Sequence, residues 1–262
     1  MFEDTTLVVV GDSFVYGHLG DDLNAESCHN RSWVRHLERV GNFKTSVNLG
    51  APGGSNYRSV RVLYEYLDQH YSPDEKYLVI FAASELSRFE LPVNDHVGRR
   101  YAIVYDNPDY YSIIHDETVV TALGSWRLDS NNMEKRCEPG QFSDFLSMYY
   151  ASFNDDIYSE KILRNSLFSI KAVLDKLNIK SFFTSTILTP WTLRNISLMG
   201  ETLPLIEYFY GPGQVENIGN FLSIMGFEQY PCAHYDEQAY IFLANYIYEN
   251  YLRDEQNDIQ RS

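Results

Sequence analysis

The stretch Leu7-Val-Val-Val-Gly-Asp-Ser-Phe14 decides the fold class of this chain. Its first four residues form a continuous apolar run, which is typical of a parallel strand buried on both faces. Gly11 and Asp12 end the run and favour a turn, in which the Asp12 side chain is expected to bond to its own backbone. Ser13 is therefore expected at the point where a buried strand passes into a helix.

Strands and helices continue to alternate along the rest of the chain. Further strands are predicted at 45–49, 77–83 and 179–186, and helices at 32–40, from 55 onward, at 157–177 and at 235–252. This alternation implies a parallel sheet that is covered by helices on both faces. We therefore predict a single α/β domain over residues 1–253, a three-layer α/β/α sandwich. Residues 254–262 are polar and are expected to fray.

Two segments interrupt this regular pattern. Residues 91–156 are rich in Asp, Asn and Tyr, and contain a candidate hairpin near 101–105. A connection of this length without regular structure is uncommon in a compact domain, so we interpret the segment as an insertion or lid. Residues 187–230, which include Gly211-Pro-Gly213, form a second irregular excursion.

The composition is that of a globular protein with an acidic surface. The 262 residues include 21 Lys and Arg against 36 Asp and Glu, a net charge of −15. Such a surface repels phosphate backbones and anionic lipids, so neither a nucleic acid nor a membrane is an expected partner. Three separated cysteines without a CxxC pair favour a reducing compartment. The N-terminus lacks the basic region of a signal peptide, so we expect a cytoplasmic protein.

Chemically functional residues follow the predicted strands. In an open parallel sheet, ligand sites form beyond the carboxyl ends of the strands. Ser13 follows the first strand and the glycine-rich turn 50–54 follows the second. Ser84 follows the third strand, and His234 lies just before the last helix. Because histidine is the usual base that activates a serine hydroxyl, the sequence predicts a nucleophile and a base at one edge of the sheet.

Four motifs of the chain resemble those of the SGNH/GDSL hydrolase superfamily, in the same order and over nearly the whole length. They are Gly11-Asp12-Ser13-Phe14, Asn48 through Asn56, Ala82-Ala83-Ser84-Glu85 and Pro231-Cys232-Ala233-His234. Gly-Gly-Ser-Asn at 53–56 and Ser84-Glu-Leu-Ser-Arg-Phe-Glu90 are similar to phage-encoded members in particular. The resemblance implies a flavodoxin-like parallel sheet. It also implies acyl chemistry on a serine, which uses neither a metal nor an organic cofactor.

The resemblance assigns roles to individual residues. Ser13 would be the nucleophile, His234 the general base, and the backbone amides of Ser13 and Gly53 two donors of the oxyanion hole. Ser84 stands where the family has an oxyanion asparagine, and Asn56 is a candidate substitute. Loss of one such donor can lower the rate by about 10²–10³-fold.

A second departure from the family pattern concerns the orientation of the base. Pro231 stands where the family has an aspartate that orients His234. A histidine without its orienting carboxylate can lose about 10⁴ in rate. A backbone carbonyl, Glu228 or Asp236 could take that role. Cys232 lies close to His234 in sequence, but no second Cys/His cluster completes a metal site, so none is predicted.

The resemblance therefore implies a serine esterase that hydrolyses a small O-acyl ester through an acyl-enzyme, with an O-acetylated carbohydrate as the candidate substrate. The two departures leave an alternative open. It is a catalytically impaired scaffold that serves as a phage-type binding or virion-associated protein, in the host cytoplasm or the virion. An acyltransferase on the same site is a third interpretation.

We expect Arg58 and Arg61 on a solvated helix face, and His18 at a surface or packing position.

Overall fold

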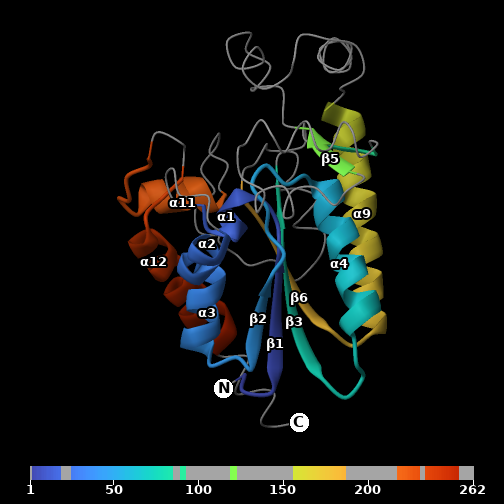
Figure 1. Cartoon of the computed structure of the whole chain (residues 1–262), viewed down its shortest axis with the longest axis horizontal. Helices are drawn as coiled ribbons and strands as arrows, with labels where there is room; N and C mark the ends of the chain where they lie inside the picture. Colours follow the sequence, from blue (N-terminus) through green and yellow to red (C-terminus); the bar gives the residue numbers. More distant parts are fainter. Residues whose placement is uncertain are drawn as a thin grey trace.

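A four-stranded, all-parallel sheet in the order β2-β1-β3-β6 forms the centre of the protein (Figure 1). The computed structural model describes residues 2–18, 25–84, 89–92, 119–122, 156–186, 217–230 and 234–253. The strands of the sheet are β1 (Thr5–Val10), β2 (Thr45–Asn48), β3 (Lys76–Ala83) and β6 (Lys180–Ser185). The predicted parallel α/β architecture is therefore confirmed, with the strands in the order 2-1-3-4 along the sheet.

The helices of the described residues are α1 (Ser13–Tyr16), α2 (Ala25–Arg31), α3 (Trp33–Gly41), α4 (Asn56–His70), α9 (Asp156–Lys176), α11 (Ile218–Ile224) and α12 (Glu237–Ile247), which continues as the π-helix η3 (Tyr248–Leu252). Helices α3, α4, α9 and α12 lie close to their predicted positions, whereas α2 and α11 were not predicted. The last helix begins two residues later than predicted, because Asp236 caps it by accepting a hydrogen bond from the Ala239 amide. In the part of the chain that the structure describes, no helix is long and apolar enough to cross a membrane.

Helices cover both faces of the sheet, as Figure 1 shows. On β1, Leu7 and Val9 belong to a buried cluster with side chains of α3, α11 and α12. Val8 and Val10 belong to a second cluster with side chains of α4 and α9. The apolar run therefore contributes alternate residues to two cores, which explains why it shows no polar alternation.

Parts of both segments that we expected to be irregular are regular. Strand β4 (Phe89–Pro92) pairs antiparallel with β5 (Val119–Ala122), which lies inside 91–156. Helix α11 lies inside 187–230, and the Asn217 side chain caps it. The prediction was wrong there because these elements are only four and seven residues long, too short for a clear period. The candidate hairpin near 101–105, residues 211–213 and the tail 254–262 lie outside the described residues.

The strand register brings the ends of three strands to one edge. Val10 of β1 lies opposite Phe81 of β3, and Ala83 of β3 lies opposite Ser185 of β6. The residues that follow these strands therefore emerge side by side, although they are far apart in sequence. This edge of the sheet positions the candidate site.

Candidate active site

Ser13 and His234 meet at the carboxyl edge of the sheet. The Oγ atom of Ser13 lies 2.7 Å from Nε2 of His234, across 221 residues of sequence. Both residues are almost fully buried, with 6% and 8% of their surfaces exposed. A hydroxyl and an imidazole at this distance have the geometry needed for the histidine to remove the hydroxyl proton.

The first turn of α1 fixes the position of Ser13. Asp12 is the N-cap residue, and its Oδ1 atom accepts a hydrogen bond from the Phe14 amide at 3.0 Å. Gly17 ends this one-turn helix in the left-handed conformation, at a φ of 87°. Its amide and that of His18 both donate to the Ser13 carbonyl. The predicted role of Asp12 in its own turn is thus confirmed.

The Asp12 carboxylate also joins the ends of three strands. It is fully buried, and its Oδ2 atom accepts hydrogen bonds from Ser84 Oγ at 3.1 Å and from Thr186 Oγ1 at 2.7 Å. Asp12 follows β1, Ser84 follows β3 and Thr186 follows β6. The carboxylate therefore connects the turn that carries Ser13 to the residues that follow β3 and β6. The sequence analysis did not identify Thr186, which it placed as the last residue of the predicted strand 179–186, whereas β6 ends at Ser185.

The glycine-rich turn packs directly on α1. A Cβ atom at Gly50 would lie 2.5 Å from the Tyr16 amide nitrogen, so only glycine fits. Gly53 has a φ of 69°, a left-handed conformation that favours glycine. Among the described residues, neither the amide of Ser13 nor that of Gly53 donates a hydrogen bond.

The two side chains considered as further oxyanion donors are bonded to protein groups. Ser84 donates its hydroxyl hydrogen to Asp12. The Asn56 side chain makes two hydrogen bonds to the backbone of Ser84: its Oδ1 accepts from the Ser84 amide at 2.8 Å, and its Nδ2 donates to the Ser84 carbonyl at 2.9 Å. These bonds fasten the start of α4 to the end of β3. In this arrangement both side chains act within the scaffold.

Two aromatic rings contact the imidazole of His234. The His18 ring lies 4.4 Å from it between centroids, and the Phe14 ring 5.1 Å. Nothing in the sequence pattern distinguished His18 from the other histidines, and only the course of the chain after α1 brings it here. Of the acids that could orient His234, Asp236 caps α12 and Glu228 is exposed. Pro231 lies outside the described residues.

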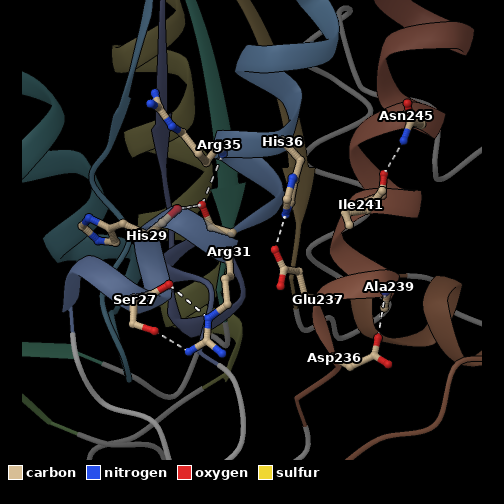
Figure 2. Close-up of polar contacts among 11 residues, drawn as sticks. Ser27, His29, Arg31, Arg35, His36, Asp236, Glu237, Ala239, Ile241 and Asn245 are labelled. Atoms are coloured by element: carbon tan, nitrogen blue, oxygen red, sulfur yellow. Dashed lines mark hydrogen bonds and ion pairs between the residues drawn. The ribbon is translucent and has the colours of Figure 1, made fainter.

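The segment that carries His234 is anchored on both sides. The Tyr235 side chain is fully buried, and its hydroxyl donates to the Gly219 carbonyl of α11 and accepts from Gln229 Nε2 at 2.9 Å. Figure 2 shows His36 of α3 pointing toward Glu237 of α12, with 3.3 Å between Nε2 and Oε1. Burial lowers the pKa of His36, and the Glu237 charge opposes this shift. His234 thus lies in a short segment just before α12, and the contacts of Tyr235 and Glu237 hold this segment and the helix on the domain.

Arg58 is buried, and our expectation of a solvated position was wrong. Only 7% of its surface is exposed, and its Nη1 atom donates to the Leu49 carbonyl at 2.8 Å. The guanidinium thereby supports the start of the glycine-rich turn. Arg61, one turn further along α4, is partly exposed and pairs with Glu65 at 3.0 Å.

The described residues contain no cluster of three or more His, Cys, Asp or Glu side chains that could hold a metal ion. Cys232, considered above as a ligand, lies outside them. A comparison of the sequence with models of protein families found no match, and neither did a comparison with curated proteins. The interpretation of this site therefore depends on its geometry and on the motifs described above.

Proposed function

We propose that this protein is a serine esterase of the SGNH type, with the flavodoxin-like three-layer α/β/α architecture of that superfamily. Its substrate would be a small O-acyl ester, such as an O-acetylated carbohydrate. The observation that carries the proposal is the contact of 2.7 Å between Ser13 Oγ and His234 Nε2. The buried strand ends hold this pair at the edge where parallel α/β sheets bind ligands.

The proposed reaction uses the pair in both halves of the cycle. His234 Nε2 takes the proton of Ser13 as Oγ forms a bond to the ester carbonyl carbon. The carbonyl oxygen becomes an oxyanion, which the amides of Ser13 and Gly53 stabilise. The tetrahedral intermediate then collapses, and its C–O bond to the alcohol breaks as His234 returns the proton to the leaving oxygen. Water, deprotonated by His234, then attacks the acyl carbon; the bond from this carbon to Ser13 Oγ breaks as His234 returns the proton to Oγ, and the acid is released.

The hydrogen bonds of Ser84 and Asn56 predict modest catalysis. With the Ser84 hydroxyl bonded to Asp12, the proposed oxyanion hole consists of the amides of Ser13 and Gly53 alone. We therefore expect turnover to be about 10²–10³-fold below that of a site with three donors.

Tyr57, which follows Asn56 and is 40% exposed, offers an aromatic surface beside the glycine-rich turn that suits a sugar ring.

Covalent labelling tests the proposed function directly. A fluorophosphonate should add once to the wild-type protein, as measured by intact mass. Ser13→Ala should give no adduct, and His234→Ala should label at least 100-fold more slowly. Ser72→Ala, which alters a serine in the loop before β3, serves as the matched control and should label like the wild type. Circular dichroism verifies that each variant is folded.

The alternative is an SGNH-like scaffold that binds a partner without chemistry. The hydrogen bond from Ser84 to Asp12 favours it, because that hydroxyl is directed away from an oxyanion donor role. Absence of an adduct on folded wild-type protein would support this alternative and contradict the esterase. The search would then turn to a binding partner.

A further inference from the structure

We propose that His18 is a positioning residue for His234 and that the two imidazoles titrate as a coupled pair, in which a proton on one ring disfavours a proton on the other. The role of His234 as a base rests on the proposed function. The coupling is a property of the folded chain itself, so it can be tested whether or not the protein has esterase activity.

The contact between the two rings carries this proposal. Their centroids lie 4.4 Å apart at an interplanar angle of 46°, closer than the 5.1 Å that separates the Phe14 ring from His234. His18 is held by its own backbone on both sides. Its amide donates to the Ser13 carbonyl at 3.1 Å, and its carbonyl accepts from the Tyr240 hydroxyl of α12 at 3.2 Å. His18 is thus tied both to the nucleophile residue and to the helix that follows the base.

Two imidazolium rings at this separation repel each other. The first proton taken up on acidification can reside on either ring, but its charge disfavours the second proton. In part of the molecules His18 therefore takes the proton that a lone His234 would have taken. Consequently, His234 remains neutral, and able to act as a base, at a pH where an isolated imidazole with a pKa of about 6.5 would be charged.

Other titratable groups lie on the elements around the pair. Asp12 precedes Ser13 and is held by Ser84 and Thr186. Among the described residues, further groups on these elements take part in structural contacts: Tyr16 and His29 pack against each other, Asp236 caps α12, and the Tyr235 and Tyr240 hydroxyls donate to backbone carbonyls. A substitution of His18 leaves all of these side chains in place. A change in the titration of His234 in such a variant therefore reports on the His18 side chain.

An NMR titration of the His234 imidazole tests the coupling without requiring turnover. In the wild type, we expect the His234 signal, assigned by its loss in His234→Gln, to titrate in two steps at least one pH unit apart. In His18→Phe, which retains an aromatic ring, it should titrate in one step. His70→Phe, which replaces an exposed histidine on α4, is the control and should retain two steps. A single step with the same midpoint in wild type and His18→Phe would refute the coupling. His18→Gln replaces the Phe variant if the latter does not fold.

The pH dependence of fluorophosphonate labelling tests the effect on the base. For each protein, the quantity compared is the labelling rate at pH 5.5 divided by the rate at pH 8. This ratio should be at least threefold lower for His18→Phe than for the wild type, because His234 of the variant is more fully protonated at pH 5.5. At pH 8 the Phe variant should label within about twofold of the wild type, whereas His18→Ala should be about tenfold slower. Equal rates for His18→Ala and wild type at pH 8 would refute the positioning role. If the wild type does not label at all, the esterase proposal fails, while the NMR titration still decides the coupling.

Discussion

Replacement of Asp12 by alanine should destabilise the domain by about 4–5.5 kcal/mol, because a buried acceptor for three donors is lost. The Phe14 amide loses its cap, which contributes about 1 kcal/mol. The Ser84 and Thr186 hydroxyls lose charge-assisted bonds of about 1.5–3 kcal/mol each. Thr186 Oγ1 also lies 3.2 Å from the Ala83 carbonyl and can turn to it, so its loss falls at the low end of that range.

Urea unfolding, followed by far-UV circular dichroism, measures this loss. Asp12→Asn is the matched variant, since its side-chain oxygen can still accept from Phe14 and its amide can donate to the hydroxyls, which accept as well as donate. We expect a loss of about 1–2 kcal/mol for it. Ser185→Ala removes a buried hydroxyl that donates to the Ala83 carbonyl at 2.9 Å, and should lose only about 1 kcal/mol.

The order of these three variants is the decisive result. If Asp12→Ala is no less stable than Ser185→Ala, the carboxylate does not join the strand ends as we have argued. The labelling rate gives a second readout. Because Asp12 directly precedes Ser13, the alanine variant should also label more slowly with a fluorophosphonate at temperatures where it remains folded.

Three further predictions concern the turns and helices around the site. Gly50→Ala should lower the free energy of unfolding by at least about 2 kcal/mol in a urea titration, because the new methyl group would overlap the Tyr16 amide. Arg58→Met should lose about 1.5–3 kcal/mol in the same assay because the Leu49 carbonyl loses its charged donor, whereas Arg61→Met on the exposed face should lose less than about 0.5 kcal/mol. Burial lowers the pKa of His36 below 6.5, so the unfolded chain binds a proton more readily than the folded chain. The free energy of unfolding should therefore decrease as the pH drops below 6.5. Between pH 7.5 and pH 5.5, His36→Phe should lose less of this free energy than the wild type.

The sequence predicted the sheet well because its signals are local. The run Leu7–Val10 and the strand 77–83 are apolar throughout, and both are buried as parallel strands. The amphipathic pattern of 157–177 likewise predicted α9, whose Leu163, Leu167 and Ile170 are buried. Strand ends then converge by topology alone, and for this reason Ser13 and His234 could be paired across 221 residues.

Features that depend on packing between distant segments were not predictable in this way. The Arg58 side chain has the same local context as that of Arg61, and only the fold of the turn before α4 buries Arg58 while Arg61 stays partly exposed. Ser84 was expected to serve the oxyanion, but its partner Asp12 comes from a different strand end. The contact of His18 with His234 depends on where the chain turns after α1, and no hydrophobic periodicity in the sequence predicts that turn.

The wide sequence separation within the site bears on the order in which the newly made chain can assemble it. Asp12 finds its partners 72 and 174 residues later, and Ser13 meets His234 after 221 residues. Such non-local contacts form only after the intervening chain has closed. At about 5–20 residues per second, synthesis takes roughly 10–45 s to pass from Ser13 to His234. A ribosome-bound chain therefore carries Ser13 as an ordinary serine during most of its synthesis, and under the proposed function it becomes reactive only when the last helix docks.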